Sequence, residues 1–472
     1  MAIRSDNLGV KSWSPRSSSA GVSLERMVGG MTIIDRVEPA AVSAAPEISS
    51  RLSPVRLRFV GDREEYWWLM IRGGLLQMIT LGIYRFWLFT DMRRFLWAST
   101  EVDDETLEYT GTGLELLIGF LLAIGILVPI YALLFVASLE LGILSRLSGV
   151  VAVVVLAGFG QYALYRARRY RLTRTVFRGL RFHQTGSAVR YAVRAMLWWI
   201  PTVLTLGLAS PWATANLERY KMRNTFYGSL GGSFAGSGGR LFLRGLLIWL
   251  LIVGPFVAGI VAAIVTIDWP AVGDAFELDQ YERGINALRG NESIGQGIRM
   301  LAGGILSSSL FAMVLYPAYE AVVMRWWLGG LRLGGAAVAS DLPMRRYYFA
   351  YLRYLLYVVA FSIAYFVVAA VVLGIAYFAL RGFIDFADAP FTRGGTGPGA
   401  ILAAISGIVL YVIYILGVST IYQVVVKMRL WQVAIESILI SSIAVLDHVQ
   451  AGAATSSAVG EGLADALGAG AI

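Results

Sequence analysis

The sequence contains no cysteine and only two histidines, His183 and His448, which lie far apart along the chain. The absence of cysteine excludes disulfide bonds, thiolate catalysis and cysteine-ligated zinc. Neither histidine belongs to an HExxH motif or to a cluster of metal-binding side chains. No metal and no cofactor is therefore expected. No paired catalytic groups stand out either, so the chain is predicted not to be an enzyme.

Charge is also scarce. Only 15% of the 472 residues are charged, whereas soluble proteins average about 25%. Hydrophobic residues make up 57% of the chain, and its mean hydropathy is +0.65. Several apolar runs approach or exceed the ~18–20 residues that a helix needs to cross a bilayer. The sequence therefore predicts a polytopic α-helical membrane protein.

The charge that is present is mostly positive. The formal net charge is +9 and the isoelectric point is about 9.6. In a membrane protein such an excess is typical of cytoplasmic loops, because lysine and arginine resist translocation. We therefore expect membrane lipids as partners and no nucleic acid. The sequence does not decide whether a protein partner or a second copy of the chain binds as well.

The hydrophobic stretches do not all fit as membrane spans. Eight can be marked, at roughly 66–89, 115–137, 147–165, 191–212, 241–266, 299–320, 350–380 and 400–426. Seven arginines lie between Arg166 and Arg181, and the loop after 212 is also basic. A span between these two loops would place one of them outside, against the positive-inside rule. If 66–89 and 191–212 are re-entrant or interfacial, this conflict disappears. We therefore predict about six transmembrane helices, with both termini cytoplasmic and an acidic external loop over 267–298.

The two stretches assigned as non-crossing are related by an internal duplication. Both contain the pattern T-L-G-x-x-x-x-W, and Tyr66 and Tyr191 fix the offset between the copies at 191 − 66 = 125 residues. The same offset pairs Arg94 with Arg219, Thr100 with Thr225, Gly111 with Gly236 and Gly113 with Gly238. One register held over an apolar, a basic and a glycine-rich segment indicates internal repeats. Parallel and inverted symmetry both stay open, although the basic arm after each copy favours parallel symmetry.

The duplication suggests a division of the chain. We expect a disordered cytoplasmic leader over 1–50 and a disordered tail over 450–472. Between them lie a first repeat over 51–180, a second repeat over 181–320 and a diverged C-terminal part over 321–449. Each repeat contains a re-entrant segment, a basic arm and two spans, and the last part contains two spans and arms.

The basic arms change their pattern after the hydrophobic stretches. Residues 105–111 alternate apolar and polar side chains, and residues 175–182 are rich in β-branched and aromatic types. Both patterns favour strands. Single arms of this kind do not bury a face alone. We therefore predict short β-rich cytoplasmic arms that pack together under the spans.

The residues of the first copy also support a family resemblance. They include Phe59-x-Gly61, Tyr66, the Thr80–Tyr84 segment with Trp87, Arg93-Arg94, Thr100, and Glu108 to Gly111 followed by Glu115-Leu116-Leu117. With these motifs the chain resembles the bacterial inner-membrane family typified by YjgN, a domain of unknown function. The resemblance is strong over 55–125 and clear over 180–245. It implies a multi-pass protein of the bacterial inner membrane and implies no activity.

Two sets of residues are candidates for function. The first is a predicted pathway or repeat interface formed by Thr80, Gly82, Trp87, Thr205, Gly207, Trp212, Arg72 and Arg194. Broken helices at repeat interfaces bind substrate in many transporters. Alternatively, the glycines permit close packing, the threonines bind backbone and the tryptophans lie at the headgroup level, which is the favoured interpretation. Glu320 and Arg353 also lie in or at the edges of apolar stretches, where charged residues often mark a solute path.

The second set consists of basic residues that follow the apolar segments: Arg93, Arg94, Arg168, Arg169, Arg219, Lys221 and Arg325. Such residues capture anionic lipid headgroups or solutes, or they set topology and extend toward the interface. Two functions remain open. One is a channel or transporter for a small or anionic solute. The other is a non-catalytic scaffold or regulator whose cytoplasmic arms bind lipid headgroups or a protein partner.

Overall fold

Six long apolar helices account for most of the hydrophobic sequence in a computed structural model of the chain. The structure describes residues 54–140, 143–277, 286, 288–380 and 398–450, all of which belong to one unit, Ile48–Ile472. The leader predicted over 1–50 and nearly all of the tail predicted over 450–472 lie outside these residues. Part of the predicted external loop over 267–298 also lies outside them, as do residues 141–142 and 381–397.

The six helices are α4 (Gly113–Glu140), α5 (Ile143–Arg174), α8 (Gly238–Thr266), α11 (Glu292–Gly330), α12 (Met344–Leu380) and α13 (Pro398–Tyr422). Each is long and apolar enough to cross a membrane, and among the described residues no other helix meets both conditions. A π-helical turn, η2 (Gln423–Lys427), and α14 (Met428–Glu436) continue α13. The number of long apolar helices agrees with the six spans predicted from the sequence.

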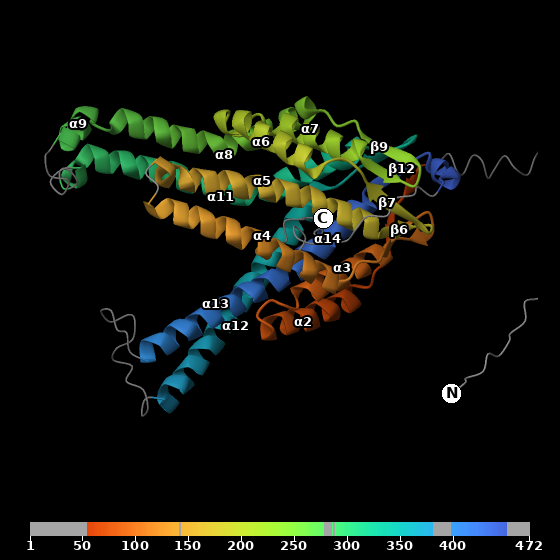
Figure 1. Ribbon diagram of the computed structural model, residues 1–472, viewed down its shortest axis with the longest axis horizontal. Coiled ribbons are helices and arrows are strands. Elements are labelled where there is room, and N and C mark those ends of the chain that lie inside the picture. Colours follow the sequence, from red (N-terminus) through yellow and green to blue (C-terminus); the bar gives the residue numbers. More distant parts are fainter. Residues whose placement is uncertain (1–53, 141–142, 278–285, 287, 381–397, 451–472) are drawn as a thin grey trace, which may run out of the picture. The chain divides into compact units, whose positions relative to one another are not determined.

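The spans pack as consecutive pairs: α4 with α5, α8 with α11, and α12 with α13 (Figure 1). The helices α8 and α11 approach each other closely at two glycines. A Cβ atom placed on Gly304 would lie only 2.8 Å from the Cα atom of Gly259. Near this crossing the Ser308 hydroxyl donates a 2.6 Å hydrogen bond to the Ile252 carbonyl. Small residues and interhelical hydrogen bonds of this kind stabilise helix pairs in a bilayer, where the hydrophobic effect does not.

The two shorter apolar stretches do not form single helices. The first divides into α2 (Arg63–Ile79) and α3 (Arg85–Ala98), and the second into α6 (Ala188–Leu204) and α7 (Ser210–Arg223). Neither stretch is among the candidate spans of the described residues. Each divides at its Thr-Leu-Gly motif, so both copies are helical hairpins.

A nine-stranded sheet lies at one end of the helices. Its order is β1-β12-β11-β10-β9-β8-β7-β6-β5, and a separate sheet has the order β2-β3-β4. The strands are β1 (Val55–Arg56), β2 (Arg58–Phe59), β3 (Thr100–Val102), β4 (Glu105–Thr106), β5 (Glu108–Tyr109), β6 (Thr175–Phe177), β7 (Leu180–Gln184), β8 (Thr225–Tyr227), β9 (Leu230–Phe234), β10 (Leu331–Leu333), β11 (Ala336–Ser340) and β12 (Ile438–Ser441). Strands therefore occur in both segments, 105–111 and 175–182, whose patterns favour them. The cytoplasmic location of these arms stays a prediction.

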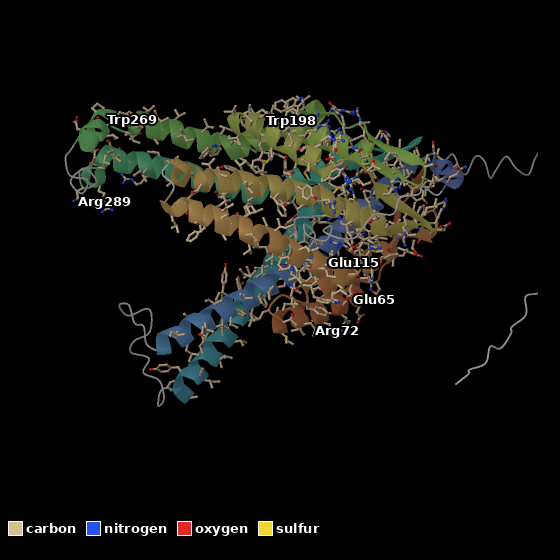
Figure 2. The ribbon with its side chains drawn as sticks, viewed as in Figure 1. Glu65, Arg72, Glu115, Trp198, Trp269 and Arg289 are labelled. Atoms are coloured by element: carbon tan, nitrogen blue, oxygen red, sulfur yellow. The ribbon has the colours of Figure 1, made fainter. Side chains whose placement is uncertain are left out.

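The strand pairing shows where each helical excursion starts and ends. Phe59 before the α2–α3 hairpin pairs with Thr100 after it, and Gln184 pairs with Thr225 across the α6–α7 hairpin. The three span pairs also begin and end at neighbouring strands, β5 and β6, β9 and β10, and β11 and β12. Every excursion from the sheets therefore returns to a neighbouring strand. Trp269 and Arg289 lie at the opposite end of the α8–α11 pair (Figure 2).

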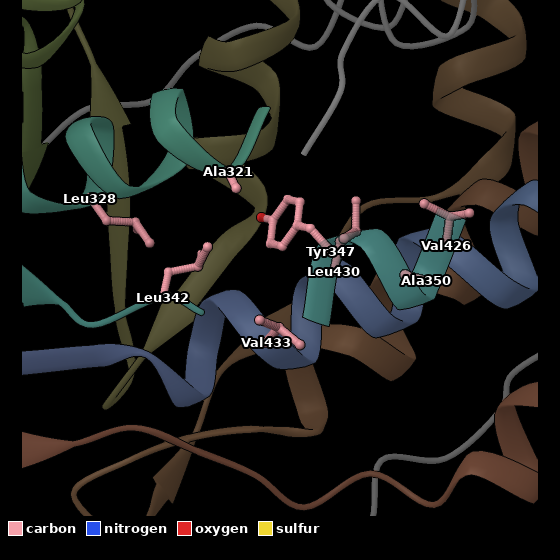
Figure 3. Close-up of a cluster of buried hydrophobic side chains, with 8 residues drawn as sticks. All are labelled: Ala321, Leu328, Leu342, Tyr347, Ala350, Val426, Leu430 and Val433. Carbon is pink, nitrogen blue, oxygen red and sulfur yellow. The ribbon is translucent and has the colours of Figure 1, made fainter. Parts of the chain in front are cut away.

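The buried core is concentrated near the sheet. The largest cluster lies where α11, α12, η2 and α14 meet, and it surrounds the fully buried ring of Tyr347 (Figure 3). By contrast, no more than 17% of the most apolar window of any span is buried. The exposed surface of the spans is apolar, as expected for helices in contact with lipid.

Candidate functional site

The Thr-Leu-Gly motif of the first copy is a tight turn that joins α2 to α3. The Thr80 hydroxyl donates to the Leu76 carbonyl (2.8 Å) and accepts from the Tyr84 amide (3.0 Å). One side chain therefore satisfies groups at the end of one helix and the start of the next. Gly82 has a φ of +96°, which glycine adopts without strain, and its amide donates to the Gln77 carbonyl at 2.7 Å.

The second copy repeats these contacts. The Thr205 hydroxyl donates to the Pro201 carbonyl (2.7 Å) and accepts from the Ala209 amide (3.0 Å). Gly207 has a φ of +92°, and its amide donates to the Thr202 carbonyl at 2.7 Å. The side chains of Leu81 and Leu206 in the two turns are exposed. The motif thus encodes a hairpin turn with an apolar tip.

The tryptophans of the motif lie against the following spans. A Cβ atom on Gly113 would lie 2.9 Å from the Cα atom of Trp87, and one on Gly238 would lie 2.9 Å from that of Trp212. The spans α4 and α8 therefore each start with a glycine that lets the span approach the second helix of the preceding hairpin. Gly207 also borders a small apolar cavity of about 190 Å³.

The two arginines of the predicted pathway lie on the hairpins. Arg72 is exposed on α2 (Figure 2). Arg194 is exposed on α6, and its guanidinium carbon lies 4.7 Å from the centre of the Tyr220 ring. A role of these eight residues in solute passage stays a prediction.

Three of the basic residues hold the arms in place. The guanidinium group of Arg94 donates to the Gly111 carbonyl (2.8 Å) and that of Arg219 to the Gly236 carbonyl (3.0 Å). Arg169 donates in the same way to Gly186. In all three cases the acceptor is 17 residues further along the chain. These side chains therefore fasten the end of each strand hairpin to the helix before it. Arg325 is exposed on α11.

Two other predicted residues, Arg93 and Arg168, meet at a cavity of about 360 Å³ that α3, α5, α11 and the η2–α14 segment enclose. We call it the basic cavity. Arg171 and Lys427 add two further cations to its lining, which contains no carboxylate. The remaining lining is mostly apolar: Phe89, Met92, Leu96, Trp97, Leu172, Thr175, Met324, Trp327, Leu328, Leu331, Trp431, Ala434, Ile435 and Ile438.

Neutral groups contact three cations of the basic cavity, and the Glu218 carboxylate also acts electrostatically on Arg168. The Arg93 side chain is buried, and its Nη1 lies 3.5 Å from the hydroxyl of Tyr109. One Nη of Arg168 lies 3.5 Å from the Thr225 hydroxyl, and its buried Nε has no hydrogen-bond partner among the described residues. The Nζ atom of Lys427 lies 5.6 Å from the centre of the Phe89 ring, a cation–π distance.

The three tryptophans of the basic cavity, Trp97, Trp327 and Trp431, each donate a hydrogen bond from the indole N–H group to a group of the protein. Trp97 donates to the Thr175 hydroxyl at 2.9 Å, and Trp431 donates to the Thr100 hydroxyl at 3.0 Å. These two rings also stack, with their centres 4.9 Å apart. Since their polar atoms are bonded within the protein, the rings present apolar surface to the cavity.

Trp327 links the cavity to a buried ion pair. Its indole N–H donates to the Glu218 carboxylate at 3.1 Å, and Glu218 also pairs with Lys221. Burial lowers the pKa of Lys221, and the neighbouring Glu218 carboxylate opposes this shift. Lys221 therefore belongs to an internal ion pair beside the cavity and does not line it.

The π-helical turn η2 determines which side chains reach the cavity. A π turn contains one residue more than an α turn, and such turns are frequent at functional sites. The hydroxyl of the buried Tyr66 donates to the Gln423 carbonyl in this turn at 3.1 Å. Lys427, at the end of the turn, faces the basic cavity, while Val424 and Val425 line a groove on the other side.

Only Arg93 and Arg168 of the lining residues were among the candidates from the sequence, and the cations and tryptophans that were missed are Arg171, Lys427, Trp97, Trp327 and Trp431. Arg171 was one of seven arginines between Arg166 and Arg181. No local signal distinguishes it from its neighbours. Among the described residues no group of three histidine, aspartate or glutamate side chains is placed to hold a metal ion.

The long apolar helices and the sheet at their ends define a polytopic helical membrane protein. The chain belongs to a family of bacterial proteins of unknown function (DUF898), whose model matches residues 54–466. This agrees with the resemblance to the YjgN-like family seen in the sequence. No curated protein and no solved structure matches the chain.

Proposed function

We propose that this protein is a non-catalytic protein of the bacterial inner membrane that binds an anionic amphiphile in the basic cavity. The observation that carries the proposal is a lining of four cations and no carboxylate, set among three tryptophans and aliphatic side chains. A pocket lined by charges of one sign attracts ligands of the opposite sign. A ligand with an anionic head and an apolar body complements both parts of the lining.

The dimensions of the basic cavity also fit a small ligand. Its volume of about 360 Å³ lies within the range of about 300–1,000 Å³ that is typical of small-molecule sites. The volume suits a single acyl chain with its head, or the headgroup of a larger lipid. We therefore propose an anionic amphiphile as the ligand. We favour a scaffold or regulatory role over transport.

In the proposed topology the six long helices cross the membrane and the two hairpins do not. The support is that each hairpin starts and ends at paired strands, Phe59 with Thr100 and Gln184 with Thr225. The hairpins then dip into the bilayer with their exposed leucines at the tips. The sheet and its arginine-rich arms lie on the cytoplasmic side, together with both termini.

Contacts that recur at a fixed spacing favour two copies of one ancestral unit. The turn hydrogen bonds, the positive φ angles and the arginine-to-glycine contacts all recur at the offset of the sequence repeat. Since both hairpins return to the same side, we propose that parallel symmetry relates the copies.

Transport of the same amphiphile is the second candidate. It is supported by the position of the cavity at the ends of α5 and α11 and at the turn after α13. These helices are spans as well as cavity walls, so a ligand that reaches the cavity lies next to membrane-spanning segments. The described lining of the cavity lies at the ends of these helices and not along their length, which is why binding is the first candidate.

A quenching experiment tests the proposal on the full-length protein in phosphatidylcholine nanodiscs. The probe is 12-bromododecyl phosphate, whose bromine quenches tryptophan fluorescence on contact, and 12-bromododecanol is the neutral match. We expect saturable quenching by the phosphate. The Arg93→Gln/Arg168→Gln variant should weaken binding at least tenfold, since a hydrogen bond to a charged group contributes about 1.5–3 kcal/mol.

Arg325→Gln is the matched control, because Arg325 is exposed and outside the cavity. Equal quenching by the phosphate and the alcohol, or equal affinity of the parent and the double variant, would refute binding in the basic cavity. Faster entry of the probe into liposomes that contain the parent than into liposomes that contain the double variant would favour transport.

A further inference from the structure

A second basic site lies outside the cavity just described. Between α2, α12 and the η2–α14 segment is an open groove of about 660 Å³, which we call the arginine groove. It shares no lining residue with the basic cavity. The two sites use opposite faces of one helical segment: Lys427 and Trp431 face the cavity, and Met428 and Gln432 face the groove.

Four arginines line the arginine groove, Arg63, Arg346, Arg353 and Arg429, and no carboxylate does. The nearby Glu436 pairs with Arg346 at 3.1 Å. In the described part of the chain, the other three arginines have no carboxylate within ion-pair distance. One carboxylate therefore faces four guanidinium groups.

Neutral contacts hold two of these arginines. The Gln432 side-chain oxygen accepts from Arg429 at 2.8 Å and from Arg63 at 3.3 Å. The Gln432 amide donates to Glu436 at 2.7 Å. Gln432 thus brings the two guanidinium groups together without neutralising them. The result is a concentrated positive charge on the wall of an open groove.

The polarity of the groove changes along α12. Arg346, Phe349, Arg353, Leu356 and Ala360 recur at intervals of three or four residues and all line the groove, so they form one stripe on the helix. Both cations lie in the first half of this stripe, with Phe349 between them, and Leu356 and Ala360 follow. Trp67 of α2 contacts Tyr357 beside the apolar part, with ring centres 6.0 Å apart.

The apolar end of the groove continues onto lipid-facing surface. No residue in the most apolar window of α12 is buried. On α2, Trp68 and Leu75 project outward with 66% and 56% exposure. A molecule held by the arginines therefore has an apolar wall that runs directly toward the hydrocarbon region.

We propose that the arginine groove binds the headgroup of one anionic phospholipid, with an acyl chain along Leu356, Tyr357 and Trp67. Guanidinium groups match phosphate oxygens in charge and in geometry. A free phosphate would use the cationic part alone. The stripe on α12 that passes from cations to apolar side chains favours the lipid over a free phosphate. This site is separate from the basic cavity, so either proposal can fail alone.

Native mass spectrometry of the full-length protein measures this binding with phosphatidylglycerol, phosphatidylcholine and inorganic phosphate. We expect phosphatidylglycerol to bind more tightly than phosphatidylcholine, and inorganic phosphate not to displace it. Arg353→Gln/Arg429→Gln should weaken phosphatidylglycerol binding about 25-fold, since each basic residue near an anionic lipid contributes about fivefold. Arg353→Lys/Arg429→Lys, which keeps the charge, should retain most of the affinity and shows that the fold tolerates substitution there.

Two matched variants isolate the groove. Arg72→Gln removes an exposed arginine from α2 outside the groove, and Arg93→Gln/Arg168→Gln removes two cations from the basic cavity. Arg72→Gln should bind phosphatidylglycerol as the parent does, and the cavity variant should keep the phosphatidylglycerol adduct that Arg353→Gln/Arg429→Gln weakens. Equal binding of the two phospholipids, displacement by inorganic phosphate, or a double glutamine variant within twofold of the parent would overturn the proposal.

Discussion

Replacing Thr80 with valine tests whether the Thr-Leu-Gly motif is a turn or part of a binding site. Valine has nearly the same shape as threonine but lacks the hydroxyl group. The substitution removes the acceptor for the Tyr84 amide at the start of α3. It also removes the donor to the Leu76 carbonyl, which still accepts from the Thr80 amide at 3.0 Å. The main loss is thus one helix-capping hydrogen bond.

Loss of such a cap costs about 1 kcal/mol, within a range of about 0.5–2 kcal/mol. We therefore expect Thr80→Val to lower the free energy of unfolding by about 1 kcal/mol. Thr205 makes the matching contacts with Pro201 and Ala209, so Thr205→Val should cost the same amount. Each variant is thus the control for the other.

The assay is equilibrium unfolding in mixed micelles with increasing dodecyl sulfate, followed by tryptophan fluorescence. Binding of 12-bromododecyl phosphate should be unchanged in both variants, because neither threonine lines the basic cavity. Unchanged stability together with a tenfold loss of probe binding would refute this reasoning. It would show that the Thr80 hydroxyl contacts the ligand, as the pathway hypothesis requires.

Two further predictions concern the spans. Gly304→Leu should lower the free energy of unfolding by about 1–3 kcal/mol through overpacking, because a Cβ atom there would lie 2.8 Å from Gly259. Gly303→Leu is the control, since a Cβ atom on Gly303 meets nothing within 4 Å, and equal melting temperatures would contradict the prediction. In topology, the cysteine-free chain allows single cysteines at the exposed Arg181, Ser233 and Asp274. The first two should react with impermeant maleimide only from the cytoplasmic side, and the third only from outside. Labelling of Arg181→Cys and Ser233→Cys from opposite sides would exclude a non-crossing α6–α7 hairpin.

Much of the helical framework follows from local sequence. A span is recognised by the length and composition of one continuous segment, so all six apolar helices were predictable. The hairpin turns are also local, since Thr80 and Gly82 act on groups within four or five residues of themselves. The contacts of Arg94 and Arg219 were not predictable from composition. Both were candidates for lipid binding, and both donate to a glycine carbonyl in their own arm.

The sequence by itself determined a membrane protein with six apolar helices, two interrupted hydrophobic stretches and basic arms. These properties depend on hydrophobic length, helix-breaking residues and charge bias, which act over a few neighbouring residues. Only the tertiary structure decided where the cations gather. Thr100 and Trp431 are 331 residues apart, yet they are hydrogen-bonded at the wall of the basic cavity. The cavity exists because strand pairing brings the ends of distant helices together, and no local pattern encodes that pairing.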